Sequence, residues 1–231
     1  MNTTTTTVTT TVTTTTTSIP SKPVKSHLIF VLDRSGSMDS IASDAIGGFN
    51  AFVEGQKAVE GEAELTLVQF DHILETVFER VPLQQVQKLT PQMYFPRGMT
   101  ALNDAIGCTI NKYQTPDNQN VKTILAILTD GAENSSKEYS GSQVADLVKK
   151  AEDKWGWDVL FLGANIDVTT VATSYNIKDS KFAQISATSK GIEDTYAALN
   201  AATTHYRSMA SFASTDNSGF NLQDLVNNES C

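Results

Sequence analysis

Short apolar runs separated by segments of helical periodicity are the feature that most constrains the fold of this chain. Six runs are predicted as strands: His27–Leu32, Glu64–Phe70, Ile73–Val81, Val121–Leu128, Asp158–Leu162 and the short Phe182–Ile185. The first and fourth are almost entirely apolar, which is typical of strands buried on both faces of a sheet. The second and third flank Asp71-His72 and predict a strand pair.

Apolar residues recur at helical spacing between most of these strands. The predicted helices cover about 41–52 with Gly55 as a stop, 102–113, 144–151 behind a capping box of Ser140 and Gln143, 168–175 and 192–209. Strands that alternate with helices of this length predict an α/β fold. We expect a doubly wound, mostly parallel sheet flanked by helices, with one antiparallel edge strand.

The folded part is predicted to be one domain at 27–212, between two tails. Residues 1–26 form a Thr-rich segment, in which 3–17 comprise thirteen threonines and two valines. Such a tract has too little apolar surface to offset the entropy of ordering it, so we expect a disordered spacer. Residues 213–231 are polar, and we expect a frayed C-terminal tail.

Composition excludes several classes of function. The chain has 26 acidic and 17 basic residues and a net charge of −9, which is unfavourable for binding a phosphate backbone, so no nucleic acid partner is expected. No run approaches the roughly 18 apolar residues of a membrane span. We expect Cys108 and Cys231 to be reduced thiols and recognise no secretory leader, which predicts a cytoplasmic protein, monomeric on its own.

Three loops at the predicted carboxyl edge of the sheet carry oxygen-bearing side chains. Asp33, Ser35 and Ser37 follow the first strand, Thr100 precedes the 102–113 helix, and Asp130 follows the Val121–Leu128 strand. Ligands of doubly wound folds gather at this edge. Three hydroxyls and two carboxylates are hard donors that suit an octahedral cation such as Mg²⁺. Three scattered histidines and no paired cysteines disfavour zinc. Taken singly, each loop is better explained by helix capping or a turn, but the coincidence of all three at one sheet edge favours a site.

Other polar residues near this edge are weaker candidates. Asp71, Glu133, Asn165 and Asp167 follow predicted strand ends and could tune metal or partner binding, although solvated loops are the commoner reason for such residues. Arg97 lies close to Thr100 and could steer an acidic ligand toward an otherwise acidic protein.

The pattern Asp33-x-Ser35-x-Ser37, with Thr100 in GMTAL and Asp130 in TDG, resembles the von Willebrand factor type A (vWA) domain and its metal-ion-dependent adhesion site (MIDAS). Met38 after the serines resembles the bacterial and intracellular members. The resemblance implies that Ser35, Ser37 and Thr100 coordinate Mg²⁺, or Mn²⁺ or Ca²⁺, through their hydroxyls, while Asp33 and Asp130 act through water or orient the serines. It also implies an open metal position for a Glu or Asp of a protein partner, and no enzymatic reaction.

Two alternatives stay open. A strand that ends in Asp33 also resembles haloacid-dehalogenase-type phosphohydrolases, in which it would be the nucleophile, but Ser35 stands where that chemistry needs a second Asp. The other alternative is a vWA domain whose metal only braces the loops.

Overall fold

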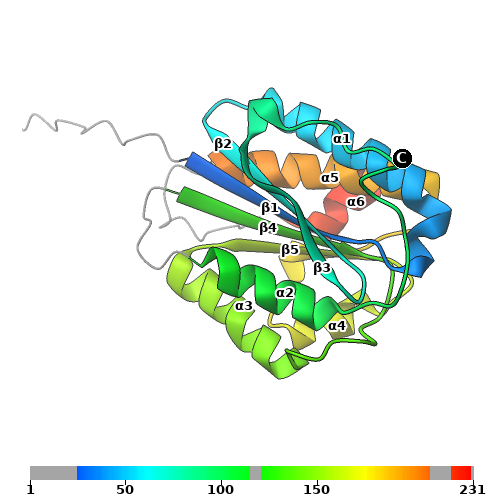
Figure 1. Ribbon diagram of the computed structural model, residues 1–231. Helices are drawn as coiled ribbons and strands as arrows, with labels where there is room; N and C mark the ends of the chain where they lie inside the picture. The colour runs from blue at the N-terminus through cyan, green and yellow to red at the C-terminus, as the bar shows by residue number, and fades with distance from the viewer. Residues whose placement is uncertain (1–24, 115–120, 209–219, 230–231) are drawn as a thin grey trace, which may run out of the picture.

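A single twisted sheet lies at the centre of the molecule (Figure 1). Within the residues that this computed structural model describes, 25–114, 121–208 and 220–229, the sheet has six strands. They are β1 (Lys25–Asp33), β2 (Ala63–Phe70), β3 (Leu74–Pro82), β4 (Val121–Thr129), β5 (Asp158–Gly163) and β6 (Phe182–Gln184). Their order is β3-β2-β1-β4-β5-β6, and β3 alone runs antiparallel to its neighbour. The predicted fold class is therefore confirmed.

Helices cover both faces of this sheet. They are α1 (Ala42–Lys57), α2 (Leu102–Tyr113), α3 (Gly141–Trp155), α4 (Val168–Ser174), α5 (Ser189–Ser208) and α6 (Leu222–Glu229), with short 3-10 turns η1 (Gly36–Ile41), η2 (Leu83–Gln85) and η3 (Asp179–Lys181). Figure 1 shows α1, α5 and α6 on one face and α2, α3 and α4 on the other. No helix in the described ranges is long and apolar enough to cross a membrane.

Strand β1 shows why the sheet needs two helical layers. Leu28, Phe30 and Leu32 pack into the core beneath α1 and α5, whereas Ile29 and Val31 pack into the core beneath α2 and α3. All five are at most 3% exposed. Because successive side chains point to opposite faces, an apolar run of this kind is stable only when both faces are covered.

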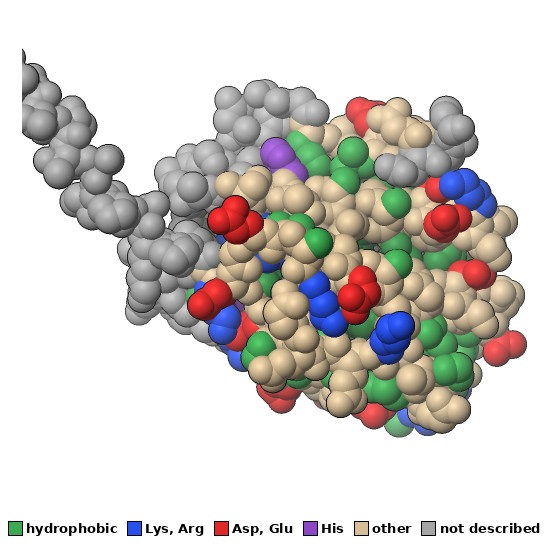
Figure 2. Space-filling view, turned by 90° about the horizontal axis from the view of Figure 1, so that it is seen from above, with side chains coloured by type: hydrophobic (Ala, Val, Ile, Leu, Met, Phe, Trp, Pro, Cys, Tyr) green, Lys and Arg blue, Asp and Glu red, His purple; other side chains and the backbone are tan. Residues whose placement is uncertain are grey.

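The outer face of the α1 and α5 layer is solvated. Acidic and basic side chains are interspersed there, with hydrophobic side chains scattered between them (Figure 2). This is the expected appearance of a helical layer that buries only its inner stripe.

Most local predictions agree with the structure. The capping box at the start of α3 is present: Gln143 N donates to Ser140 Oγ (3.4 Å), and Ser140 N donates to Gln143 Oε1 (2.8 Å). Gly55 is not a stop, because α1 continues to Lys57. It lies where α5 approaches closely, and a Cβ there would be 2.6 Å from the Asn200 amide nitrogen.

The prediction that residues 213–231 form a frayed tail is wrong for residues 222–229. Residues 222–229 form α6, and Leu222 and Val226 are buried in the core beneath α5. Gln184 N donates to Gln223 Oε1 (2.7 Å), so the helix also covers the β6 edge of the sheet. The predicted spacer at 1–26 overlaps β1 by two residues, and its first 24 residues lie outside the described ranges, as do Met209 and Cys231.

Candidate metal centre

The five predicted site residues lie at the carboxyl ends of β1 and β4 and at the start of α2. Asp33 ends β1, Ser37 lies in η1, Thr100 comes just before α2, and Asp130 follows β4. Strands β1 and β4 are parallel neighbours, so their carboxyl ends meet at one edge. Asp33, Ser35, Thr100 and Asp130 are at most 4% exposed, whereas Ser37 is exposed. The arrangement is a buried set of oxygens with one open side.

Three hydroxyl oxygens converge beside Gly131. A Cβ on this glycine would lie 2.9 Å from Thr100 Oγ1, 3.5 Å from Ser37 Oγ and 3.7 Å from Ser35 Oγ. The space between the three hydroxyls is therefore kept open because residue 131 has no side chain. Any larger residue would place a methyl group among the oxygens.

The spacing of these oxygens suits a small divalent cation. Ser35 Oγ and Ser37 Oγ are 3.0 Å apart. Two ligands at right angles around Mg²⁺, each about 2.1 Å from it, are also separated by about 3.0 Å. In the described parts of the chain no three His, Cys, Asp or Glu side chains gather as a metal site, so the candidate set is mainly hydroxyl in character.

Asp33 is held in place but its charge is poorly balanced. Ser35 N donates to Asp33 Oδ1 (2.6 Å) and Thr129 Oγ1 donates to Asp33 Oδ2 (2.5 Å). Burial raises the pKa of Asp33 to about 6, although the hydrogen bonds from Thr129 and Ser35 act in the opposite direction. Among the described groups that shift this pKa no cationic side chain appears.

Asp130 is in a similar state. Burial raises the pKa of its carboxyl group, and the hydrogen bond from Ser37 opposes that shift. The Ser37 hydroxyl donates to Asp130 Oδ1 at 2.5 Å and so joins the first loop to the loop after β4. Two buried carboxylates with raised pKa values beside three hydroxyls form a site in which a cation would be favourable.

Asn134 positions Thr100, and sequence reasoning missed this role. Thr100 N donates to Asn134 Oδ1 (2.9 Å), and Asn134 N donates to Thr100 O (3.0 Å). Glu133, a weaker candidate, braces the same loop by accepting hydrogen bonds from Asn103 N (2.8 Å) and Ser136 N (2.8 Å). No local pattern in the sequence indicates the pairing, because the partners are more than 30 residues apart.

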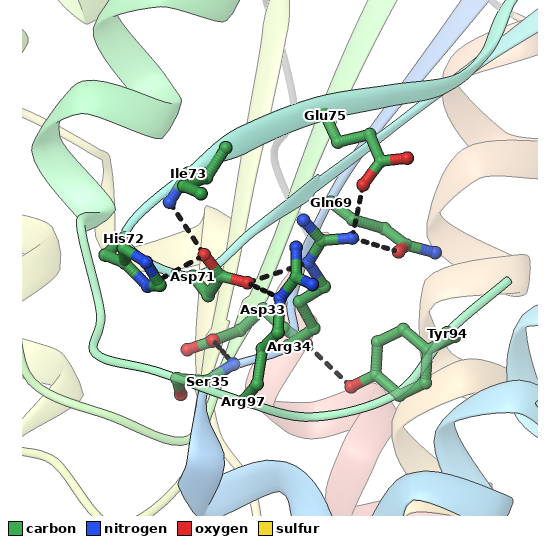
Figure 3. A network of polar contacts seen from close by, with 10 residues as sticks. All are labelled: Asp33, Arg34, Ser35, Gln69, Asp71, His72, Ile73, Glu75, Tyr94 and Arg97. Atoms are coloured by element: carbon green, nitrogen blue, oxygen red, sulfur yellow. Dashed lines mark hydrogen bonds and ion pairs between the residues drawn. The ribbon is translucent and has the colours of Figure 1, made fainter.

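Asp71 is the centre of a separate charged network (Figure 3). Its Oδ2 accepts hydrogen bonds from Arg34 Nε (3.1 Å) and Arg97 Nε (2.9 Å), and its Oδ1 accepts one from Ile73 N (2.7 Å). His72 Nδ1 lies 3.1 Å from Asp71 Oδ1. Burial would raise the pKa of Asp71, but the hydrogen bonds from Arg97 and Ile73 and the charge of Arg34 outweigh it, so the pKa is lowered. Asp71 therefore has two counter-charges within the chain, Arg34 and Arg97.

Arg34 is a buried residue that sequence analysis passed over. It is 1% exposed, and its Nη1 donates to Glu75 Oε2 (2.6 Å) and Gln69 Oε1 (3.3 Å). It connects the loop after β1 to β2 and β3. Tyr94 supports the same loop, because its hydroxyl donates to the Asp33 carbonyl oxygen at 2.7 Å (Figure 3).

The two remaining weaker candidates have structural explanations. Asp167 caps α4, since Thr170 N donates to its Oδ1 at 3.0 Å. Asn165 adopts a left-handed backbone conformation with φ of 55°, which asparagine tolerates better than most residues. Neither observation connects these residues to the five site residues.

Comparison with known proteins settles the family. The family model for the von Willebrand factor type A domain matches residues 27–214. The chain belongs to the vWA domain family. This agrees with the mostly parallel sheet and its antiparallel edge strand. No curated protein matches the sequence significantly.

Solved structures support the vWA fold at low sequence identity. Proximal thread matrix protein 1 from the mussel byssus, with a zinc-occupied MIDAS motif, has a TM-score of 0.58 and 13% identity over 79% of this chain and 46% of its own. The PilB minor pilin from Streptococcus sanguinis has a TM-score of 0.59 and 12% identity over 81% and 63%. A von Willebrand factor type A structure from Catenulispora acidiphila has a TM-score of 0.54 and 12% identity over 80% of this chain and 43% of its own. This chain therefore matches only part of each solved chain, and the likeness establishes the fold.

Proposed function

We propose that this vWA domain binds a divalent cation at the strand edge and uses it to bind an acidic side chain of a protein partner. Ser35, Ser37 and Thr100 would coordinate the cation directly, and Asp33 and Asp130 would hold it through water or orient the serines. The observation that carries the proposal is the convergence of three hydroxyls on the space beside Gly131, next to a buried carboxylate with a raised pKa.

The donor set explains why such a cation would bind a carboxylate. Neutral hydroxyl ligands neutralise less of the positive charge of a cation than carboxylates do. The bound ion would therefore remain electrophilic at a free coordination position. Ser37 is exposed while the other site residues are buried, so a partner can approach from one side only. We assign no reaction to the site, and the domain acts as a binding module.

Mg²⁺ is the proposed ion, with Mn²⁺ or Ca²⁺ as substitutes, because all five donors are hard oxygens. The zinc-occupied MIDAS motif of the mussel matrix protein makes zinc the competitor to test beside them. A competition titration of the Mn²⁺-loaded protein with Mg²⁺, Ca²⁺ and Zn²⁺ would rank the four ions.

Calorimetric titration with Mn²⁺ tests the metal site directly. Wild type should bind one ion. Asp33→Ala should lose binding because it removes the buried charge, and Gly131→Ala should lose it because the methyl group would lie 2.9 Å from Thr100 Oγ1. Asp39→Ala is the matched control, since Asp39 is an exposed carboxylate of the same loop. Unchanged titration of a folded Asp33→Ala protein would refute the proposal.

An open coordination position distinguishes a metal that binds a partner from a metal that only braces the loops. Water bound to Mn²⁺ relaxes solvent protons, and a carboxylate that displaces this water reduces the relaxation rate. Addition of N-acetylglutamic acid α-amide to the Mn²⁺-loaded protein should lower the rate, and the neutral N-acetylglutamine α-amide should not. A bracing metal with all positions filled by the protein would respond to neither.

The phosphohydrolase alternative is less compatible with the geometry. Both oxygens of Asp33 already accept hydrogen bonds, from Ser35 N and Thr129 Oγ1, which lowers the nucleophilicity of the carboxylate. Ser35 also cannot act as the carboxylic acid that this reaction needs. A screen with p-nitrophenyl phosphate and Mg²⁺ should show no hydrolysis that Asp33→Ala abolishes.

We also propose that the protein is a cytoplasmic monomer with no nucleic acid partner. Its net charge of −9 opposes both self-association and binding to phosphate backbones. Burial, followed by the hydrogen bond to Glu138, raises the pKa of Cys108 to about 11, so this thiol stays protonated and poorly reactive. Light scattering after size-exclusion chromatography should give the mass of one chain.

A further inference from the structure

Four large hydrophobic side chains are exposed in the described part of the chain, and all lie in or next to two loops beside the candidate metal centre. They are Ile73 (52% exposed), Leu74 (37%), Phe95 (47%) and Met99 (55%), called here the apolar rim. Ile73 and Leu74 lie where β2 turns into β3. Phe95 and Met99 lie on the segment before α2, and Met99 directly precedes Thr100.

The two loops of the apolar rim are tied together at Asp71. Ala101 N donates to the Asp71 carbonyl oxygen (2.9 Å), and the Asp71 carboxylate accepts hydrogen bonds from Arg97 Nε (2.9 Å) and Ile73 N (2.7 Å). Figure 3 shows Ile73, His72 and Arg97 arranged around this carboxylate. The rim is thus held by the same buried network that fixes the loop after β1, and it has a defined place beside Thr100.

A cavity of about 480 Å³ adjoins the rim and offers room for a side chain. Its lining is mostly polar: Arg34, Glu75, Thr76, Gln92 and Arg97 lie beside Val77, Met93 and Phe95. The guanidinium carbon of Arg97 lies 5.1 Å from the centre of the Phe95 ring, so these two lining residues pack against each other.

We propose that the apolar rim is the second half of the partner-binding surface, and that the partner is a protein segment in which large apolar residues flank the metal-bound Glu or Asp. This inference rests on the proposed function. Exposed apolar side chains gathered at one place indicate an interaction surface. Arg34 and Arg97 both pair with Asp71, and Arg34 also pairs with Glu75, so these charged groups beside the rim already have partners and the exposed apolar side chains are left to contact a partner protein. A second copy of this chain is a poor occupant, because each chain carries a net charge of −9.

A displayed peptide library tests the proposal. Each peptide has a fixed central Glu and randomised flanking positions; it is captured on the full-length Mn²⁺-loaded protein and released with EDTA. Wild type should enrich Leu, Ile, Phe or Met next to the Glu. The double variant Ile73→Ser, Met99→Ser should still release peptides with EDTA but lose this enrichment. The matched control Ile73→Val, Met99→Leu should keep it. Affinity for a recovered peptide should fall about tenfold or more in the serine variant.

The outcomes separate this inference from the proposed function. Peptides released by EDTA from wild type without apolar enrichment would overturn the apolar rim alone. A protein that binds Mn²⁺ in calorimetry but releases no peptide with EDTA would overturn acidic-partner binding, and the rim with it. Concentration-dependent dimers that the serine variant abolishes would show that a second copy covers the rim, which also contradicts the proposal.

Discussion

Asp33 and Asp71 lie at neighbouring strand ends, and their carboxylates are in opposite electrostatic states. Asp33 ends β1, Asp71 directly follows β2, and both are 0% exposed. Burial raises the pKa of Asp33 to about 6, with hydrogen bonds from Thr129 and Ser35 only partly opposing it. Burial acts on Asp71 in the same direction, but the Arg97 and Ile73 hydrogen bonds and the Arg34 charge reverse the shift.

The opposite pKa shifts of Asp33 and Asp71 indicate which of the two carboxylates is available for an external cation. Two guanidinium groups of the chain itself balance Asp71, so this residue joins loops and builds the edge of the sheet. Asp33 receives neutral donors only, and its charge is costly until a cation arrives. A buried carboxylate thus has a structural role at Asp71 and is available for metal binding at Asp33.

The largest expected effect comes from removing the internal counter-charge. Arg34→Met should lower the free energy of unfolding by about 3–5 kcal/mol, because it leaves a buried carboxylate short of a partner. Urea denaturation measures the loss. Arg97→Met is the matched control and should cost less than about 1 kcal/mol, since the Arg97 side chain is 42% exposed. Equal losses in the two variants would break the comparison.

Metal should stabilise the protein through Asp33 and not through Asp71. At a concentration of Mn²⁺ 100 times its dissociation constant, the free energy of unfolding should rise by about 2.7 kcal/mol. Thermal melts with Mn²⁺ and with EDTA measure this difference. Arg97→Met should keep the response, whereas Asp33→Asn should lose it. A response that persists in Asp33→Asn would place the ion elsewhere.

In EDTA, neutralising Asp33 and neutralising Asp71 should change the free energy of unfolding in opposite directions. A pKa of Asp33 raised from 3.8 to about 6 means that its charge destabilises the folded state by about 3 kcal/mol at pH 7. Replacement by Asn removes this cost but also loses one hydrogen bond, which lowers the gain in stability by about 1 kcal/mol. Asp33→Asn should therefore stabilise the metal-free protein by about 2 kcal/mol at pH 7. Asp71→Asn should destabilise it, because two guanidinium groups lose their charged acceptor.

The pH dependence checks the sign. Because the folded pKa of Asp33 lies above the unfolded value, its contribution to stability is complete below about pH 3.8 and is lost as the pH rises toward 6. The advantage of Asp33→Asn over wild type should therefore be small at pH 4 and grow until about pH 6. An advantage of equal size at pH 4 and pH 7 would contradict a buried carboxylate as its cause.

Asn134 should affect metal affinity more than stability. Asn134→Ala removes the side-chain acceptor that holds the Thr100 backbone, and Mn²⁺ affinity should fall about tenfold, as is usual for residues that orient ligands. Asn134→Asp keeps an acceptor oxygen and should retain binding in the same calorimetric titration. Wild-type affinity in Asn134→Ala would show that Thr100 needs no such support.

The smallest effect is expected outside this edge of the sheet. Deletion of residues 1–20 should leave both the melting temperature and the Mn²⁺ response nearly unchanged, because the Thr-rich segment has little apolar surface to bury. A fall of many degrees in a thermal melt would mean that this segment packs against the domain.

The strands were predictable because their signal is local. An apolar run such as Ile29–Val31 shows burial on both faces in the sequence itself, and strand ends follow from it within one or two residues. Helix α6 was missed, although Leu222 and Val226 are spaced one helical turn apart. Apart from Leu225 its other residues are polar, and its stability comes from packing on α5 and β6 rather than from its own pattern.

The alternation of strands and helices is readable in the amino-acid pattern, and so is the placement of Asp33, Ser35, Ser37, Thr100 and Asp130 at one edge of the sheet. Three features depend on packing instead: Gly131 opens the space between the hydroxyls, Asn134 holds Thr100, and Arg34 supplies one of the two counter-charges of Asp71. The physical reason is distance along the chain: Arg34 and Asp71 are 37 residues apart. Which buried charge has a counter-charge depends on packing between loops, and no local pattern records it.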